Sequence, residues 1–484
     1  MKRFVSYIFI AVAALGMTAC KDFLEKAPVL SQSTELTLST YSGLDKAVAG
    51  AYSYLGNSSW YGGERILEAE MRAGNGIKHA DHTSNRYMTQ MNWNYTADAT
   101  SSMWAIGYYT ISRCNNVIDN LEGKDEEAGV EAQDLNNLKA ECLFLRALSH
   151  FDMVTLFALP YNYVKANEAS LKEEQKLGVP YVYHTDPDAR PARDGVVKVY
   201  ENIAADLVEA ESIIAPDYVR AGVADKKAAV TLPAIQALLC RVYLYMGEWQ
   251  KCADYATKVI NNDSFKLYEA AEYATVWNQP VGGSEVIFEN YIDLSNYSNL
   301  DCSYMTYPEG AYGDCIASNS LISLYSEDDV RGKLYRQDSQ QTPGLWWTLK
   351  YEGKGLNIPD ANNTVILRLS EMYLNRAEAL VNGANVAGAT ALDDINAIVT
   401  RRGIAALTSA GMEAIRLERR KEFAWEGQLF FDLARWGQPV NRESCYGLME
   451  KNQNIPFPDY RWALPVPKRE LEVNENLKQN DQYE

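Results

Sequence analysis

The sequence predicts a mostly α-helical protein, in which tetratricopeptide-like helical hairpins form a scaffold with long irregular loop insertions. Over most of the 484 residues, apolar side chains recur at steps of three and four, which is the spacing of one helical face. Two stretches, 57–98 and 265–360, lack this period and combine Gly, Asn and Ser with aromatic residues, as loops do. Since no low-complexity linker divides the chain, we expect one domain.

The clearest hairpin is predicted over 232–260. Gly247 permits a tight turn between two helices, and Trp249 fills the groove between them. The small Ala253 and Ala256 let the two helices approach closely. This order of large and small residues is typical of tetratricopeptide repeats, which stack to bury a common core. Further helices are expected over 41–55, 102–121 and 132–159.

The stretch 364–437 is predicted to contain three helices. The first ends at Asn382-Gly383, because Gly and, less often, Asn tolerate the left-handed backbone that stops a helix. The second covers about 387–401. The third begins near Met412 and continues into a segment rich in Phe, Trp and Leu.

Three glutamates in this third helix need cationic partners. Glu418, Glu422 and Glu426 are four residues apart, so on one helix they place like charges on the same face, which is destabilising. The aromatic residues around them argue against an open surface. We therefore expect charge-assisted pairing with arginines of the preceding hairpin, with a solvated acidic face as the alternative. The candidate partners are Arg368, Arg376, Arg401 and Arg402.

Four blocks in this part of the chain resemble the C-terminal half of the RagB/SusD family. In order, they read LRLSEMYLNRAEAL, INAIVTRRG, IRLERRKEFAWEGQLFFDLARWG and WALPVPKRELEVNENLKQN. Members of this family are outer-membrane lipoproteins that capture nutrients, mostly glycans, for a partner transporter. The resemblance implies a SusD-like α-α superhelix over 20–484. Its ligand-loop portion would cover about 20–360 and its helical C-terminal portion about 361–484.

The N-terminus is predicted to be a lipoprotein signal peptide, residues 1–19. Lys2 and Arg3 precede an apolar core at 4–15 that is too short to span a membrane. The sequence MTAC, which ends at Cys20, approximates a lipoprotein cleavage box, so Cys20 is the expected lipidation site; ordinary secretion with a thiol at Cys20 is the alternative. By the resemblance, the lipid would anchor the protein to the outer membrane, facing the cell exterior.

The composition also limits the partners. The formal net charge of −18 argues against nucleic acid, because nucleic-acid binding relies on Lys and Arg that neutralise phosphates. It also makes a polyanionic glycan a less favourable ligand, unless a local basic patch overrides the average. In an exported protein, Cys302 and Cys315, which bracket a loop, are the best candidates for a disulfide.

Aromatic residues beside polar ones in the two loop stretches indicate sugar binding. A sugar ring has an apolar face that stacks on an aromatic side chain, and hydroxyl edges that Asn, Asp, Arg or Gln satisfy. The segments 91–95 (MNWNY) and 346–351 (WWTLKY) supply both kinds of group. Loops on a rigid scaffold commonly carry recognition. By the resemblance, the ligand-binding residues are Arg72, Asn92, Trp93, Tyr312, Trp346 and Trp347.

The sequence carries no positive signal for catalysis. It has neither a Gly-x-Ser-x-Gly nucleophile elbow nor a Gly-rich phosphate loop. His79 and His82, with Asp81 between them, lack a third metal ligand at a standard spacing, so we interpret them as part of a solvated loop. Close carboxylate pairs arise by chance among 64 acidic residues, so they do not indicate a glycosidase. We expect no catalytic residue, metal or cofactor.

These observations favour a surface lipoprotein that is not an enzyme. It would bind glycans and deliver them to a SusC-like TonB-dependent transporter in the outer membrane, as the resemblance implies. Capture of peptides or other nutrients on the same scaffold is the alternative. A glycoside hydrolase is the third hypothesis, which would require a loop carboxylate pair.

Overall fold

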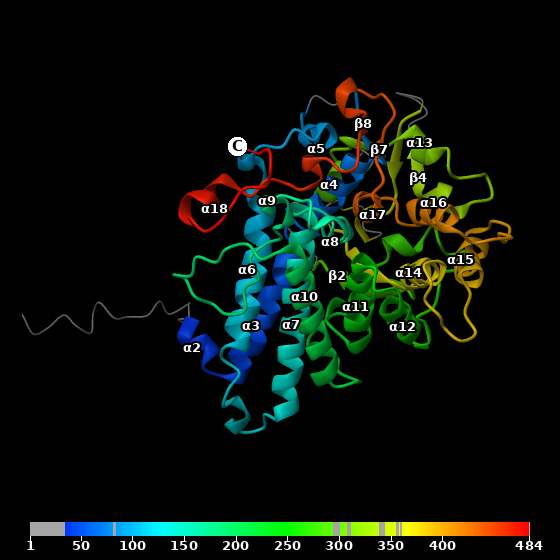
Figure 1. The fold of residues 1–484 in the computed structure, drawn as a ribbon. Helices are drawn as coiled ribbons and strands as arrows, with labels where there is room; N and C mark the ends of the chain where they lie inside the picture. Colours follow the sequence, from blue (N-terminus) through cyan, green and yellow to red (C-terminus); the bar gives the residue numbers. More distant parts are fainter. Residues whose placement is uncertain are drawn as a thin grey trace, which may run out of the picture.

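Paired helices form most of the structure, a computed structural model that describes residues 34–80, 84–293, 301–306, 311–337, 344–354, 358 and 361–483. The predicted signal peptide and Cys20 lie outside these residues. Figure 1 shows a row of helices that runs from α3 across the molecule to α15. Each helix packs against the next one in the row, which consists of α3 (Tyr41–Leu55), α6 (Ser101–Ile118), α7 (Ala132–Phe157), α10 (Val196–Ile213), α11 (Leu232–Met246), α12 (Trp249–Ile260), α14 (Leu369–Val381) and α15 (Ala391–Val399).

The other α-helices of the described residues connect the members of this row or cover one end of it. They are α2 (Thr34–Leu38), α4 (Glu64–Ala73), α5 (Met88–Asn92), α8 (Tyr161–Asn167), α9 (Glu173–Lys176), α13 (Asn319–Ile322), α16 (Met412–Glu422), α17 (Leu429–Trp436) and α18 (Lys468–Val473). Among the described residues, no single helix is long and apolar enough to cross a membrane. The pair α7 and α8, bent by 65°, passes that test of length and composition only when taken together.

The hairpin predicted over 232–260 is confirmed as α11 and α12. Helix α11 ends at Gly247, whose φ of 68° lies in the left-handed region that glycine adopts without steric cost. Ala253 and Ala256 are fully buried on α12, and Trp249 packs partly buried against the core. The helices predicted at 41–55, 102–121 and 132–159 also form, with ends that differ from the prediction by at most three residues.

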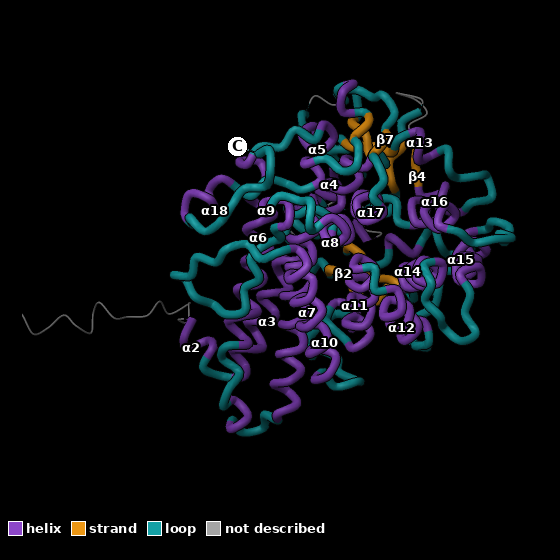
Figure 2. The backbone as a smooth tube through the Cα atoms, in the orientation of Figure 1, coloured by secondary structure: helices purple, strands orange, loops and turns teal. Residues whose placement is uncertain are grey.

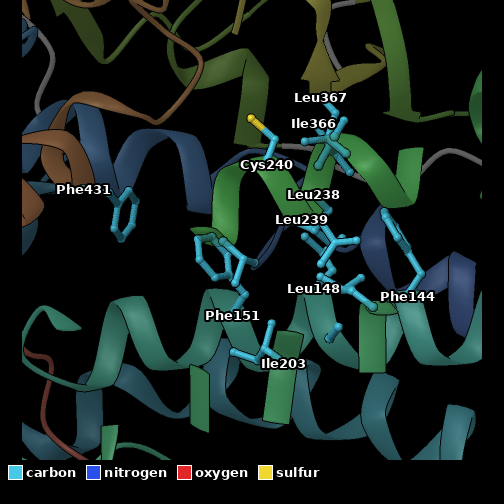
Figure 3. Close-up of a cluster of buried hydrophobic side chains, with 14 of the residues drawn as sticks. Phe144, Leu148, Phe151, Ile203, Leu238, Leu239, Cys240, Ile366, Leu367 and Phe431 are labelled. Atoms are coloured by element: carbon cyan, nitrogen blue, oxygen red, sulfur yellow. The ribbon is translucent and has the colours of Figure 1, made fainter. Parts of the chain in front are cut away.

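The core lies where α7, α10 and α11 meet strand β6 (Thr364–Arg368) and helix α17 (Figure 3). These side chains are almost completely removed from solvent. Burying one Leu, Ile or Phe side chain contributes about 1.5–3 kcal/mol, so the stacking of hairpins is the main source of stability. The labelled core residues are Phe144, Leu148, Phe151, Ile203, Leu238, Leu239, Cys240, Ile366, Leu367 and Phe431.

Strands in the described part of the chain form four antiparallel pairs. They are β1 (Gly76–Lys78) with β3 (Cys315–Ala317), β2 (Val286–Asn290) with β6 (Thr364–Arg368), β4 (Tyr335–Gln337) with β5 (Trp346–Thr348), and β7 (Val440–Asn441) with β8 (Asn454–Ile455). In the first pair, Ile77 is opposite Ile316. Figure 2 shows β4 and β7 near α13, at the end of the molecule where α4 and α5 also lie.

The two stretches predicted as loops therefore contain regular structure, and α4 is the largest element that was missed. Nine of its ten residues are buried. In its sequence, ERILEAEMRA, Arg65, Glu68 and Arg72 cluster on one side of the helix, and these charged side chains are buried together with the apolar ones. Arg65, for example, donates to Asp152 of α7 at 3.1 Å. This helix of ten residues lies within a stretch whose Gly, Asn and aromatic residues predicted a loop, and it was therefore missed.

The helix predicted to begin near Met412 is broken in two. Helix α16 ends at Glu422, and the backbone turns through Trp425 (φ 63°) and Gly427 (φ 72°) before α17 begins. Glu426 lies in this turn, so the three glutamates do not share one helical face. The first helix of this stretch also begins later than predicted, because residues 364–368 form β6.

Pairing of the glutamates with arginines is confirmed for two of the four predicted partners. Arg368 and Arg402 each donate to Oε1 of Glu422 at 2.8 Å. Arg368 also donates from Nε to Glu426 at 2.8 Å. Burial alone would raise the pKa of Glu422, but the guanidinium groups of Arg402 and Arg368 hold this pKa well below its usual range. The ion pairs of Arg368 and Arg402 with Glu422 thus connect β6, the segment after α15 and the end of α16 inside the protein.

The other two predicted arginines have different acidic partners, and Glu418 pairs with an arginine that the sequence did not indicate. These contacts are Arg376 with Asp394 (2.6 Å), Arg401 with Glu269 (3.1 Å) and Arg331 with Glu418 (2.6 Å).

The disulfide expected between Cys302 and Cys315 is not present in the structure. Both residues are buried thiols. The Sγ of Cys302 donates to the carbonyl of Gly62 at 3.6 Å, a contact that requires the S–H group.

Candidate ligand-binding site

Arg72 and Trp93, which the sequence predicted as ligand contacts, are buried. Trp93 is 1% exposed, and its Nε1 donates to the backbone carbonyl of Arg72 at 3.1 Å. The guanidinium of Arg72 lies 3.9 Å from the ring centre of Phe430, and its Nη2 donates to the carbonyl of Arg461 at 2.6 Å. These contacts join α4 to the C-terminal part of the chain. The structure therefore does not support either side chain as a ligand contact.

Asn92 and Trp347 are also interior side chains that position the backbone. Nδ2 of Asn92 donates to the carbonyl of Gly447 at 2.8 Å, and its Oδ1 accepts from the amide of Met449 at 2.8 Å. Nε1 of Trp347 donates to the carbonyl of Gly313 at 3.1 Å. Sequence composition does not distinguish an aromatic or amide side chain that packs against its own chain from one that packs against a sugar. The burial of Asn92 and Trp347 therefore does not support either side chain as a direct ligand contact.

Tyr312 and Trp346 remain accessible among the six predicted contacts. Tyr312 is 52% exposed. It immediately precedes Gly313, whose carbonyl accepts the hydrogen bond from the buried Trp347. Trp346 is partly buried against the second hydrophobic cluster of the protein. Of the two, Tyr312 presents the larger surface to solvent.

Two further residues, Arg86 and Tyr304, complete the surface around Tyr312. The ring centres of Tyr304 and Tyr312 are 4.9 Å apart. The guanidinium carbon of Arg86 lies 4.6 Å from the ring centre of Tyr304 and 4.7 Å from that of Tyr312. We name Arg86, Tyr304 and Tyr312 the tyrosine–arginine cluster. Both missed residues lie in the predicted loop stretches, but no local pattern marks them because their contact joins distant parts of the chain.

The strand pair β1–β3 brings the two halves of this cluster together. Lys78 of β1 is opposite Cys315 of β3, which places Lys78 beside Asp314. Its Nζ donates to Oδ1 of Asp314 at 2.9 Å, and the hydroxyl of Ser84 donates to the same oxygen. Nη1 of Arg86 is 3.5 Å from Oδ2 of Asp314. The buried Asp314 carboxylate thus ties the segment that carries Arg86 to the segment that carries Tyr312.

The cluster has the chemistry of a surface sugar site. The tyrosine rings offer apolar faces and hydroxyl groups, and a guanidinium supplies several N–H donors. The side chain of Arg86 is 41% exposed, so these donors are accessible to a ligand. Since the supporting contacts are buried, the backbone beneath the exposed side chains is fixed before a ligand arrives.

A separate cavity of about 370 Å³ lies between α3, segment 220–228 and the end of β2. Tyr52, Arg220 and Tyr291 are among its lining residues. The polar groups of this cavity are already engaged: Arg220 donates to Glu141 at 2.8 Å and to Asp45 at 2.6 Å. Because its cation is neutralised by the protein itself, the cavity is a weaker candidate than the tyrosine–arginine cluster.

His79 lies in the protein interior, whereas the sequence predicted that it belongs to a solvated loop. It is buried, with its ring centre 5.5 Å from that of Trp347. Asp81 and His82 lie outside the described residues. Within the described ranges, no group of three or more His, Cys, Asp or Glu side chains is arranged to hold a metal ion.

Comparison with known proteins gives the same fold over almost the whole chain. A crystal structure of a SusD superfamily protein from Bacteroides thetaiotaomicron is 30% identical, with a TM-score of 0.80, and the match covers 92% of this chain and 100% of that one. The chain belongs to the SusD family. Two family models match it: one described as "Starch-binding associating with outer membrane" over residues 22–244, and one described as "SusD family" over residues 347–483.

Curated relatives of this SusD-family protein match it over their full length. SusD-like protein P2 of Formosa agariphila is 25% identical and covers 99% of this chain and 99% of its own. The starch-binding protein SusD of Bacteroides thetaiotaomicron is 23% identical and covers 100% of this chain and 99% of its own. The fold and family that the sequence blocks predicted are thus confirmed.

Proposed function

We propose that this SusD-family protein binds glycans through the tyrosine–arginine cluster and delivers them to a SusC-like TonB-dependent transporter in the outer membrane. The observation that carries the proposal is the exposed ring of Tyr312, which packs beside the partly buried ring of Tyr304 and the partly exposed guanidinium of Arg86. The buried Asp314 and Trp347 support this cluster. The names of the matching family model and of one relative, which refer to starch binding, support a carbohydrate ligand. An open surface site buries few ligand atoms, so we expect modest affinity.

The test is calorimetry of the protein, produced from residue 21 onward, against plant, microbial and host-mucin oligosaccharides. Tyr312→Ala and Tyr304→Ala should each weaken binding at least tenfold, because each removes an aromatic face from the cluster. The matched control is Tyr109→Ala on α6. Tyr109 is 55% exposed, and its ring centre is 6.0 Å from that of the partly buried Tyr54, so it too is the exposed member of a tyrosine pair.

The control variant should bind as the wild type does. Binding that survives both cluster variants would refute the assignment of the site. The absence of binding across the whole panel would refute glycan capture and favour the alternative, peptides or other nutrients, which the same instrument can test with a peptide library.

We further propose that residues 1–19 are removed and that a lipid on Cys20 anchors the protein at the cell surface. Labelling with a fatty-acid analogue in cells should mark the wild type and not the Cys20→Ala variant, which should leave the membrane fraction. If the variant is still labelled, Cys20 is not the lipidation site. A tagged protein should co-purify its transporter from detergent-solubilised outer membranes, and failure to do so would count against delivery.

The proposed function is binding without turnover. Incubation of a bound oligosaccharide with the protein should release no new reducing ends above those of a heat-inactivated sample. Time-dependent release would instead favour the glycosidase hypothesis, and the responsible carboxylates would then have to be found by substitution.

A further inference from the structure

The guanidinium of Arg86 is the one cation in the tyrosine–arginine cluster. Among the described residues, its charge is only weakly neutralised by an acidic partner. We propose that this cluster selects glycans that carry an anionic group on the sugar, either a carboxylate or a sulfate ester. The inference rests on the proposed function, because it names the class of glycan that the same surface takes. It runs against the expectation from the overall net charge of −18.

Most of the hydrogen-bonding capacity of Arg86 is unclaimed within the described part of the chain. A guanidinium carries five N–H donors. Arg86 donates one hydrogen bond, to Asp314, at 3.5 Å, which is longer than the roughly 2.7–3.2 Å of ordinary N–H···O bonds. The buried Arg368 differs, since its Nε, Nη1 and Nη2 all donate to acceptors within 3.0 Å.

Among the described residues in contact with Arg86 or its acidic partner, the charge balance is positive. Asp314 is the acidic partner of Arg86, and Lys78 already neutralises it at 2.9 Å. Lys78 and Asp314 are both buried, so the charge that reaches the surface is that of Arg86. At an ionic strength of 0.1 M, charges more than about 10 Å away are largely screened. A group in contact with Arg86 therefore responds to this cation more than to the acidic surface elsewhere.

The two tyrosines hold the guanidinium in place without neutralising it. Ring faces within about 6 Å attract a cation, and the guanidinium carbon is 4.6 and 4.7 Å from the ring centres of Tyr304 and Tyr312. A restrained side chain loses less conformational freedom when it binds. The planar fork of a guanidinium matches a carboxylate or a sulfate, which it can bind through two parallel hydrogen bonds. The adjacent tyrosine faces would contact the sugar ring that bears the anion.

Calorimetry with matched pairs of oligosaccharides tests this selectivity. Uronic-acid oligomers from pectin and alginate are compared with their carboxyl-reduced products, and a sulfated galactan oligomer that lacks carboxylates is compared with its desulfated form. We expect the anionic member of at least one pair to bind tenfold or more tightly than its neutral partner, since a hydrogen bond to a charged group is strong. The pair that shows this difference identifies the source of the negative charge.

Substitution of Arg86 then assigns the difference to one residue. Arg86→Gln should lower the affinity for the anionic member to that of the neutral one, whereas Arg86→Lys should retain part of the difference. Arg113→Gln is the matched control, because Arg113 is exposed on α6 and its guanidinium carbon is 5.7 Å from the ring centre of Tyr54. The melting temperature of each variant shows that it is folded.

Two results would overturn the inference while glycan binding stands: equal or tighter binding of the neutral members, or an Arg86→Gln variant that weakens both members of a pair equally. If neither member of any pair binds while another glycan of the panel does, the selectivity fails and glycan binding stands. If no glycan of the panel binds, both the proposed function and the selectivity fail.

Discussion

Nη2 of Arg402 donates to Oε1 of Glu422 at 2.8 Å, and neither side chain is exposed to solvent. The same nitrogen also donates to Oε1 of Glu285, the residue just before β2, at 2.8 Å. Arg402 follows α15 and Glu422 ends α16, so this one guanidinium connects the α14–α15 hairpin, the C-terminal helices and the β2–β6 pair. Three segments that are far apart in the sequence depend on one buried set of charges.

Removing this guanidinium should destabilise the fold strongly. Arg402→Gln leaves Glu422 and Glu285 with less neutralising charge in the interior, and breaking a buried ion pair in this way costs about 3–5 kcal/mol. Urea denaturation measures the loss of unfolding free energy. The neighbouring Arg401 provides the control: its pair with Glu269 is exposed (38% and 67%), so Arg401→Gln should cost about 1 kcal/mol or less. Similar losses in the two variants would contradict the structural role of Arg402.

Glu289 should make the protein less stable as the pH rises from acidic values to neutrality. Burial raises the pKa of Glu289 to about 7 from about 4.5 in an unfolded chain. Because the folded-state pKa is the higher one, the native state binds more protons between these values. The free energy of unfolding therefore falls as the pH increases from about 4.5 to 7, by on the order of 3 kcal/mol from this group.

The Glu289→Gln variant tests that pH dependence. Oε1 of Glu289 accepts from the amide of Gly282 and from Nδ2 of Asn363, both at 3.0 Å, and the glutamine carbonyl can keep these bonds. Urea denaturation at pH 5 and pH 8 should show a smaller decline for this variant than for the wild type. Glu472→Gln, at an exposed position, is the control and should leave the decline unchanged. Equal declines in the wild type and Glu289→Gln would refute the assignment.

Gly247 should be required for the turn between α11 and α12. Its φ of 68° strains any residue that has a Cβ atom, so Gly247→Ala should lower the free energy of unfolding by about 1–2 kcal/mol. Gly50, at a half-buried position within α3, is the matched position. An added Cβ there meets no atom within 4 Å, and Gly50→Ala should stabilise the protein by about 0.5–1 kcal/mol. Denaturation curves that show the same sign for both substitutions would contradict this account of the turn.

Trp93 and Tyr312 should separate folding from recognition. Trp93 packs at 5.0 Å from the ring centre of Trp462, and Trp93→Ala should reduce the free energy of unfolding by about 3–5 kcal/mol. Tyr312→Ala should cost about 1 kcal/mol or less because the side chain is half exposed. Thermal denaturation beside calorimetry distinguishes the two roles. A large loss of stability in Tyr312→Ala, or a well-folded Trp93→Ala protein that no longer binds, would reverse the assignment made from burial.

The helical hairpins were predictable because their apolar faces and their stop signals are local. Gly247 and the small Ala253 and Ala256 mark the α11–α12 turn and its close packing within a few residues. The missed helix α4 shows the limit of this approach. Its charges are satisfied by distant segments, as in the contact of Arg65 with Asp152, and a local pattern contains no information about such partners.

The site was predictable as a region but not residue by residue. Tyr312 is a predicted contact that the structure leaves accessible, whereas Arg86 and Tyr304, the other members of the candidate site, become neighbours only when β1 pairs with β3. Trp93 and Trp347 lie beside polar residues, as expected of a platform for a sugar ring. Their indole N–H groups nevertheless donate to the backbone of the protein itself. Local composition predicts that aromatic residues take part in a binding site. Whether a given side chain faces solvent or the interior depends on the tertiary fold.

The support of Tyr312 by Trp347 and Asp314 has a consequence for how such a protein can change during evolution. The groups that fix the backbone are buried, while the ring that meets solvent contributes little to folding. Replacements at the exposed tip are therefore tolerated by the scaffold, and they can alter which ligand is captured without a compensating change in the core. Under the proposed function, one helical framework can in this way be adapted to different glycans through a few surface side chains.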